Sequence, residues 1–470
     1  MSFASVHFLV FLAVLFAVYY LIPQNSRWIL LLIGSLFFYA YSGFIFYISL
    51  TIITTYAAAR LLGLTKRYHR LVVTAWLAIN IGMLAAVKIP AFGLLMPLGI
   101  SFYVFQSAGY IFDVRRNKAK IELNPAKLAL FVSFFPQVIQ GPISRHHELT
   151  KTLFLPENFS LANISLGLRR ILWGFFKKLV IADRLLAAVK LMSGNTDIFG
   201  GGYAALNILL YAAALYADFT GGIDITVGVA RFLGITLTEN FNKPFYSASI
   251  AEYWRRWHIT MGSWFRDYLF YPLSVAKPMR RFSKISRRYL GNGLGKRLPV
   301  YLATIITWFA TGLWHGATPN YIAWGLANGL VIILSTECEP LYKWFHKKFA
   351  FSNSKFYNNF AIVRTFLLMC AIRSFDIYRG VGLTFTMLFS IFRPWKTAII
   401  NIGLDRWDCL IALAGLSLLI IAGRRRPRQW FESQSPVIRL SLCLLLLCVI
   451  IVFGVYGYGY DASQFIYNRF

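Results

Sequence analysis

The sequence predicts an all-α protein that crosses a membrane many times. Of its 470 residues, 58% are hydrophobic and 14% are charged, whereas roughly a quarter of the residues in a soluble domain are charged. The mean hydropathy is +0.58. The apolar residues form runs much longer than the about ten alternating residues of a transmembrane β-strand. These observations exclude a soluble globule, a disordered chain and a membrane barrel.

The apolar runs give the order of the expected helices. The first run, 6–22, has no basic residue before it and no small-residue cleavage pattern after it, so we expect a retained helix. The chain length would supply on the order of ten spans of about 20 residues. No repeat or soluble domain interrupts the series, which predicts one membrane domain over 1–470. The further runs are 28–59 (broken near Gly43), 71–87, 92–112, 128–143, 203–235, 300–314, 321–334, 361–372, 408–422 and 437–455.

The charge pattern predicts the orientation of these helices. Lysine and arginine number 48 against 18 acidic residues, a formal net charge of +30. Because the basic residues gather in short clusters between apolar runs, we expect cytoplasmic loops rather than a nucleic-acid site. The last run would then leave the cytoplasm, which places the tail 461–470 and also the amino terminus outside. The clusters are 60–70, 115–120, 277–297, 343–348 and 424–428.

The segment 161–186 differs from the other runs. Its basic residues alternate with apolar ones at near-helical spacing. This pattern predicts a helix in the cytoplasmic interface, with its basic side among anionic lipid headgroups. The membrane lipids would therefore be direct partners of Arg169, Arg170, Lys177, Lys178 and Arg184.

Two polar clusters interrupt the apolar sequence, although an ionisable group at membrane depth costs about 2.5 to 3.5 kcal/mol. In the first cluster, 251–268, tryptophans and arginines surround a single histidine. On a helix, Trp254, His258 and Phe265 would share one stripe. An interfacial helix with an aromatic belt explains the tryptophans and arginines. It does not explain His258, because such a belt needs no imidazole.

The second cluster, 311–321, contains His315 between two apolar runs. Gly312, Gly316 and Pro319 allow the chain to break or to pack closely there. Two interpretations stay open for His315. It is either a satisfied structural histidine or a neutral imidazole, kept neutral by desolvation, that takes a proton from an acceptor hydroxyl.

Other polar residues give weaker signals. Asp218 and Asp224 either line a cavity or have a structural role, by pairing with Arg231 or by capping a helix. The adjacent histidines at 146–147 point apart on a helix, and the five cysteines form no Cys-x-x-Cys pair, so we expect no metal site. The sequence contains no phosphate-binding loop, Gly-x-Ser-x-Gly elbow, His-Glu-x-x-His helix or dinucleotide fingerprint. This argues against an ATP-driven pump and a serine hydrolase.

The polar clusters belong to an ordered series of motifs over nearly the whole chain. In this order the motifs resemble the membrane-bound O-acyltransferase (MBOAT) family, in particular its bacterial branch of alginate O-acetyltransferases and teichoic acid D-alanyltransferases. The motifs are Tyr253-Trp254-Arg255-Arg256-Trp257-His258-Ile259 and Gly312-Leu313-Trp314-His315-Gly316, together with 101–106, 113–115, 134–137, 141–143, 218–224, 239–245, 264–268 and 465–467.

The resemblance implies an MBOAT fold, in which a ring of tilted transmembrane and re-entrant helices surrounds a central catalytic chamber. It implies that His315 is the catalytic base and that His258 is the second histidine of the active site. We expect no bound cofactor, and the acyl donor would be acetyl-CoA or an acyl-carrier thioester on the cytoplasmic side. Substrate binding is assigned to Trp254, Arg255, Trp257, Trp314, Asn320 and Asp218.

The predicted function is that of an O-acyltransferase in the bacterial cytoplasmic membrane. It would move an acyl group, with acetyl as the favoured group, to an extracytoplasmic cell-envelope polysaccharide. An extracytoplasmic SGNH-type acyltransferase would help in this transfer. One alternative is D-alanyl transfer to teichoic acid from a carrier protein. An alternative of another class is a transporter or flippase with proton-relay histidines, which would require an internal repeat that we do not detect.

Two positions depart from the family pattern. Asn328 stands where close relatives often have a second histidine shortly after the Trp-His-Gly motif. The connector 274–297 is long and basic where the alginate enzymes usually have a short Gly-Gly-Asn segment. The resemblance therefore does not assign a role to Asn328, and it does not fix the identity of the acyl donor and acceptor.

Overall fold

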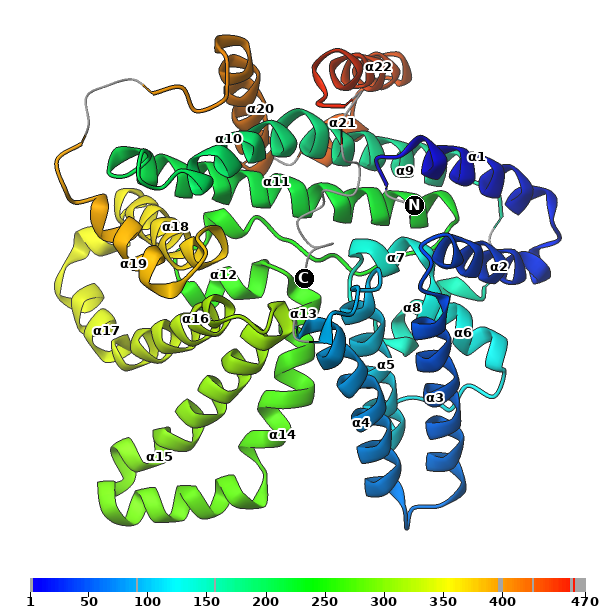
Figure 1. The fold of residues 1–470 in the computed structure, drawn as a ribbon, viewed down its shortest axis with the longest axis horizontal. Coiled ribbons are helices and arrows are strands. Elements are labelled where there is room, and N and C mark those ends of the chain that lie inside the picture. Colours follow the sequence, from blue (N-terminus) through cyan, green and yellow to red (C-terminus); the bar gives the residue numbers. More distant parts are fainter. Residues whose placement is uncertain are drawn as a thin grey trace. The chain divides into compact units, whose positions relative to one another are not determined.

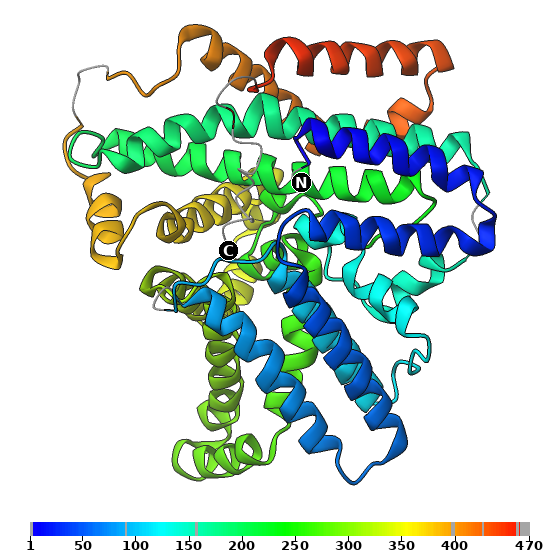
Figure 2. The same cartoon turned by 45° about the vertical axis from the view of Figure 1, so that its right-hand side comes forward.

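The computed structural model describes residues 3–89, 92–155, 158–395, 400–424, 427–456 and 460. All elements in these residues are helices (Figures 1 and 2), which confirms the all-α class. The motif 465–467, the tail 461–470 and part of the basic cluster 424–428 lie outside the described residues.

The chain forms two compact units that alternate along the sequence. Unit 1 comprises Met1–Leu185, Ala213–Thr238 and Leu404–Phe470, and unit 2 comprises Leu186–Ala212 and Glu239–Gly403. No boundary in the sequence separates them, and the single membrane domain over 1–470 stays a prediction.

Two helices of unit 1, the first and α6, start at capping residues. Ser5 accepts a hydrogen bond from the Phe8 N–H at the start of the first helix, and Asn124 does the same for two amides of α6. Helices α3 and α4 lie side by side, and α5 packs against both (Figure 2). The helices are α1 (Val6–Leu21), α2 (Arg27–Ala40), α3 (Ile45–Leu64), α4 (His69–Lys88), α5 (Ile100–Arg115), α6 (Pro125–Ser133), α7 (Phe135–Gln140), α8 (His146–Leu153), α9 (Leu161–Phe175), the π-helical segment η3 (Phe176–Ala182), α20 (Arg406–Arg424), α21 (Pro427–Glu432) and α22 (Pro436–Phe453).

Helix α9 packs against α11 (Gly202–Phe232) through two reciprocal pairs of glycines. A methyl group on Gly174 would lie 2.6 Å from the Gly221 oxygen, and one on Gly228 would lie 2.8 Å from the Gly167 oxygen. Only glycine lets the two backbones approach this closely. The contact therefore fixes which polar side chains of the two helices meet.

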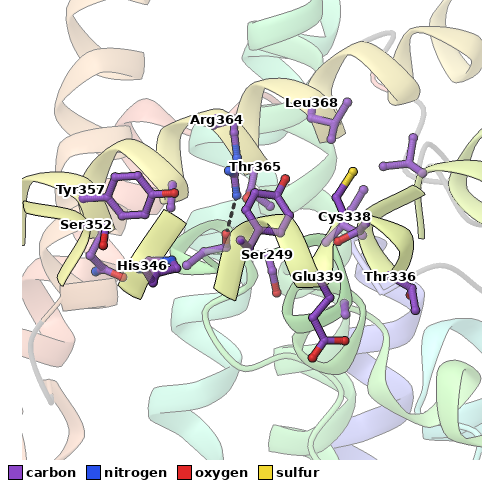
Figure 3. Close-up of a pocket in the computed structure, with 18 of the residues that line it drawn as sticks. Ser249, Thr336, Cys338, Glu339, His346, Ser352, Tyr357, Arg364, Thr365 and Leu368 are labelled. Carbon is purple, nitrogen blue, oxygen red and sulfur yellow. Dashed lines mark hydrogen bonds between the residues drawn. The ribbon is translucent and has the colours of Figure 1, made fainter. Parts of the chain in front are cut away.

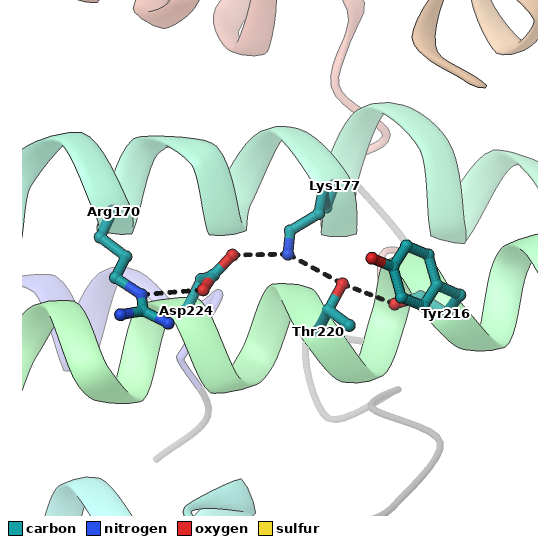
Figure 4. Close-up of polar contacts among 5 residues, drawn as sticks. All are labelled: Arg170, Lys177, Tyr216, Thr220 and Asp224. Atoms are coloured by element: carbon teal, nitrogen blue, oxygen red, sulfur yellow. Dashed lines mark hydrogen bonds and ion pairs between the residues drawn. The ribbon is translucent and has the colours of Figure 1, made fainter. Parts of the chain in front are cut away.

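Charged side chains meet along this contact (Figure 4). Asp224 of α11 pairs with Arg170 at 2.8 Å and with Lys177 at 2.5 Å. Lys178, which is 0% exposed, pairs with Asp218 at 2.7 Å and with Asp183 at 2.8 Å. The predicted contact of Lys177 and Lys178 with lipid headgroups is therefore wrong. Two of the three carboxylates, Asp218 and Asp224, come from α11, far along the chain, and the charges of both lysines are neutralised inside the protein.

Unit 2 holds the two histidine motifs. Helix α15 consists of two stretches that meet at Gly291, whose φ of 68° breaks the helix (Figure 1). The second stretch ends at His315, and α16 then folds back and packs along it. The elements are α10 (Asp183–Gly194), the first part of α11, the 3-10 helix η4 (Pro244–Tyr246), α12 (Ile250–Arg256), α13 (Ile259–Phe265), the π-helical segment η5 (Arg266–Phe270), α14 (Tyr271–Ser274), α15 (Lys277–His315), α16 (Pro319–Glu337), α17 (Glu339–Lys348), the 3-10 helix η6 (Ala350–Asn353), α18 (Lys355–Ile377) and α19 (Val381–Ser390).

Five helices of the described chain are long and apolar enough to cross a membrane: α3, α4, α11, α20 and α22. The bent pair α16 and α17 would add a sixth. This number is smaller than the count of apolar runs, because several runs are broken. The run 28–59 divides into α2 and α3, and the run 128–143 divides into α6 and α7. The structure thus contains short apolar helices as well as full spans.

Candidate active site

His258 lies at a break between two short helices. A continuous helix would put Trp254, His258 and Phe265 on one stripe, but α12 ends at Arg256 and α13 begins at Ile259. His258 itself has a left-handed backbone with a φ of 47°. Such a conformation is unfavourable for a residue with a side chain unless the surroundings hold it.

Asn240 holds this break in place. Its side-chain oxygen accepts hydrogen bonds from the Thr260 N–H at 3.1 Å and the Thr260 hydroxyl at 3.0 Å. The same oxygen lies 3.3 Å from Nδ1 of His258. Since an oxygen that accepts from a backbone N–H must be the acceptor here too, Nδ1 carries the proton and Nε2 carries the lone pair.

His258 stays neutral at neutral pH. Its side chain is 0% exposed, and this burial lowers the pKa of His258, to which the Arg373 guanidinium adds by repulsion. Arg373 belongs to α18, where its guanidinium lies 4.2 Å from the centre of the Trp257 ring. It also donates to the Tyr253 hydroxyl at 3.2 Å and pairs with Asp376 at 3.4 Å.

His315 is placed by the close packing of α15 and α16. The Cβ positions of Gly312 and Gly325 point directly at backbone atoms of the other helix, so glycine is required at both. His315 ends α15 and is 7% exposed. Its ring stacks on Tyr321 at 6.1 Å and meets Trp324 edge-on at 4.7 Å.

Four tryptophans, which we call the tryptophan cluster (Trp254, Trp308, Trp314 and Trp324), join the two histidines. The Trp314 ring is 6.0 Å from the ring of His258 and 4.9 Å from that of His315. The Trp254 ring lies 4.7 Å from Trp308 and 5.8 Å from Trp324. The structure therefore brings together both predicted histidines, Trp254 and Trp314.

Asn328 connects two helices of this cluster. Its side-chain oxygen accepts from the Trp254 indole N–H at 3.2 Å, and its amide donates to the Trp324 carbonyl at 2.9 Å. Asn328 is fully buried. The residue that departs from the family pattern thus has a definite place, where it positions the indole of Trp254.

The remaining predicted residues lie elsewhere. Arg255 is exposed, and Trp257 packs against Arg373 rather than in the cluster. The amide of Asn320 donates to the Tyr378 carbonyl at 2.6 Å and accepts from the Gly380 N–H at 3.1 Å, which joins α16 to the end of α18. Asp218 belongs to unit 1, in its ion pair with Lys178. Their roles in substrate binding stay predictions.

The residues that the sequence analysis did not single out are Asn240, Arg373, Trp308 and Trp324. Asn240 lies within the motif 239–245, which was the one available signal. The others act through contacts between helices far apart in the sequence. Among the residues that the structure describes, no group of three or more His, Cys, Asp and Glu side chains is placed to hold a metal ion.

A groove of about 900 Å³ opens in unit 2 close to the cluster (Figure 3). It is lined by the start of α12, the end of α16, the length of α17, the 3-10 helix η6 and the first half of α18. Its wall is rich in hydroxyl groups, and Arg364 crosses it to donate to the Ala248 carbonyl at 3.1 Å. Ile250 and Ile332 line the groove and lie one helical turn from Trp254 and Asn328, so the groove ends near the tryptophan cluster.

Comparison with known proteins places these features in a family. The model of the MBOAT, membrane-bound O-acyltransferase family matches residues 16–287, a range that includes His258 and ends before His315. The chain is 35% identical over 352 residues to a probable alginate O-acetylase of Azotobacter vinelandii (69% of this chain, 66% of the other). It is 31% identical over 363 residues to a peptidoglycan O-acetyltransferase of Helicobacter pylori (67% and 66%). It is 29% identical over 302 residues to a teichoic acid D-alanyltransferase of Bacillus subtilis (62% and 70%). The matches span just under two thirds of the length of the first two relatives.

Proposed function

The chain belongs to the membrane-bound O-acyltransferase family, and we propose that it transfers an acetyl group from a cytoplasmic thioester to an extracytoplasmic polysaccharide of the bacterial envelope. The observation that carries this proposal is the shared contact of His258 and His315 with the Trp314 indole. Two imidazoles in one desolvated aromatic cluster are suited to proton transfer at a reacting hydroxyl. The similarity to alginate and peptidoglycan O-acetylating proteins supports acetyl as the group.

In the proposed reaction His315 accepts the proton of an acceptor hydroxyl while the oxygen attacks the thioester carbonyl. The C–O ester bond forms, the C–S bond breaks, and the leaving thiolate takes the proton from His315. His258 presents the lone pair of Nε2, because Nδ1 is held by Asn240. It would accept a hydrogen bond from the hydroxyl and orient it.

The groove beside the cluster is the proposed site for the arm of the thioester donor, either coenzyme A or a carrier protein. Two features support this. The wall carries the positive groups Arg364 and Lys355, which suit an anionic donor, and the inner end lies one helical turn from Trp254. An SGNH-type acyltransferase on the outer side is the proposed partner that completes the transfer. The proposed location is the bacterial cytoplasmic membrane, with the basic loops inside and the carboxyl terminus outside.

D-alanyl transfer is the second candidate, because the Bacillus subtilis relative is a teichoic acid D-alanyltransferase. The donor distinguishes the two functions. The protein in lipid nanodiscs is incubated with labelled acetyl-CoA or with a D-alanyl carrier protein, and transfer of label to envelope polymer is measured. We expect acetyl transfer.

The variant His315→Ala tests the role of the base. We expect a loss of roughly 10²- to 10⁴-fold in transfer, the usual contribution of a general base, while the protein still inserts and binds the donor. The control is His7→Ala, an exposed histidine near the amino terminus, which should keep the wild-type rate. Full acylation by a well-folded His315→Ala protein would contradict the proposal and favour a transporter or flippase.

A further inference from the structure

The first stretch of α15, residues 277–290, is a strongly basic helix whose function is not explained by the active site. The basic segment 277–297 contains eight basic residues and no acidic one. After Gly291 the chain turns back, and the Ser286 hydroxyl donates to the Gly295 carbonyl at 2.6 Å. This contact fixes the helix against the start of the second stretch (Figure 1). The eight residues are Lys277, Arg280, Arg281, Lys284, Arg287, Arg288, Lys296 and Arg297.

The helix has a basic face and an apolar face. At 100° per residue, its six basic residues share a sector of about 120°, and Phe282, Ile285 and Tyr289 share a neighbouring sector of about 60°. The apolar side is open, since Ile285 is 55% exposed and Tyr289 is 76% exposed. None of the six basic residues has an ion-pair partner within the described part of the chain. Within the described residues, the basic face therefore has no ion-pair partner, and Ile285 and Tyr289 on the apolar face stay exposed.

We propose that the helix 277–290 lies in the membrane interface and binds anionic phospholipid headgroups. The basic face would meet the phosphates, and Ile285 and Tyr289 would enter the boundary of the acyl chains. An acidic protein that docked on the basic face would leave both apolar side chains in water. A bilayer surface covers both faces, so the exposed apolar side chains favour lipid.

This position has a consequence for the active site. The second stretch of α15 runs from the bend at Gly291 to His315, and Arg297 pairs with Glu337 of α16 at 2.7 Å. A helix held in the interface would hold the start of this stretch at the membrane surface. The lipid contact would thus help to fix the two helices that carry the candidate active site.

Depth measurements on the full chain test the proposal. The five cysteines are replaced, and nitroxide labels are attached to Ile285→Cys, Tyr289→Cys, Lys284→Cys and Arg288→Cys, one at a time. The proteins are reconstituted in vesicles of phosphatidylcholine and phosphatidylglycerol. We expect the labels at 285 and 289 to collide more with oxygen than with a water-soluble nickel complex, and the labels at 284 and 288 to show the reverse. Equal exposure of all four labels to the nickel complex would overturn the proposal and point to an acidic protein instead.

A charge variant tests the headgroup contact separately. Arg280, Lys284 and Arg287 are changed to Gln, and retained phosphatidylglycerol is counted by native mass spectrometry. Each basic residue near an anionic surface contributes roughly five-fold to binding, so the variant should lose most of the retained lipid. The control changes three exposed basic residues of α17, Lys343, Lys347 and Lys348, and should retain more. Equal loss in both variants would contradict a specific role for 277–290. Neither readout depends on acyl transfer, so a failure of the proposed function would not affect them.

Discussion

A methyl group at Gly325 should disturb the candidate active site without unfolding the protein. In Gly325→Ala the new carbon would lie 2.4 Å from the Trp308 carbonyl oxygen, and ordinary contact begins at 3.4 Å. The difference, 3.4 − 2.4, requires a separation of about 1.0 Å between α15 and α16. The atoms concerned belong to the backbone, so no side chain can rotate to relieve the contact.

The separation acts on groups that contact His315. Trp324, which precedes Gly325, meets the His315 ring at 4.7 Å. A misplacement of about 1 Å can cost roughly 10²-fold in rate, and overpacking costs about 1 to 3 kcal/mol of stability. Part of this loss of stability is offset, because alanine is a better helix former than glycine by about 1 kcal/mol. We therefore expect a folded protein with about 1% of the wild-type transfer rate.

The assay is acetyl transfer in nanodiscs, with thermal unfolding measured on the same samples. Gly382→Ala on α19 of the same unit is the control, because a methyl group there would meet nothing within 4 Å. Gly329→Ala is an intermediate case, because the methyl group would lie 3.1 Å from the Trp308 Cβ, a smaller overlap than at Gly325. Activity should fall in the order Gly382→Ala, Gly329→Ala, Gly325→Ala. Equal rates in all three variants would refute the idea that this helix contact positions His315.

Three further predictions concern buried polar groups. Trp254→Phe leaves the Asn328 oxygen buried without its donor, which should cost about 1 to 3 kcal/mol in unfolding free energy; unchanged stability would show that the bond is dispensable. Burial lowers the pKa of His258 below 6.5, so the unfolded chain takes up a proton at a higher pH than the folded chain does. The free energy of unfolding is therefore unaffected by this histidine above pH 6.5, and it falls as the pH drops from 6.5 toward the lowered pKa. At pH 5 the loss is roughly (6.5 − 5) × 1.36, or 2 kcal/mol, and thermal unfolding of His258→Gln should show a flatter pH profile than the wild type. Asp224→Asn removes the carboxylate from Arg170 and Lys177 and should destabilise the protein by roughly 3 to 5 kcal/mol; a smaller effect on urea or thermal unfolding would mean that water already reaches these charges.

The sequence predicts the central residues of the site but not how they are held. The motifs contain both histidines together with Trp254 and Trp314, and the structure places these four in one cluster. Asn240, which is 18 residues away along the chain, forms a hydrogen bond with the His258 ring. Arg373, on another helix, lowers the pKa of His258 further because its positive charge disfavours the protonated ring. Such contacts leave no periodic pattern in a single sequence.

Helix boundaries were predictable only where the apolar runs are uninterrupted. The runs 71–87 and 437–455 correspond closely to α4 and α22. The residues of the cluster 251–268 are compatible with helical spacing, yet the structure breaks the helix at His258. The break at His258 depends on the three hydrogen bonds to the Asn240 oxygen, which local propensity does not contain.

Two basic segments, 161–186 and 277–290, have the same alternation of basic and apolar residues, yet their environments differ. Lys177 and Lys178 of the first are buried because α11 supplies carboxylates, and the glycine pairs let the helices approach closely enough for the contact. No acidic side chain of the described chain pairs with the basic residues of 277–290, and large apolar side chains beside them stay exposed. A basic amphipathic pattern therefore predicts that the helix has a negatively charged partner, but it does not say whether that partner is protein or lipid. In the first segment, carboxylates of α11 are the partners. In the second, an anionic membrane surface is the partner that would bind the basic residues and also cover the exposed apolar side chains.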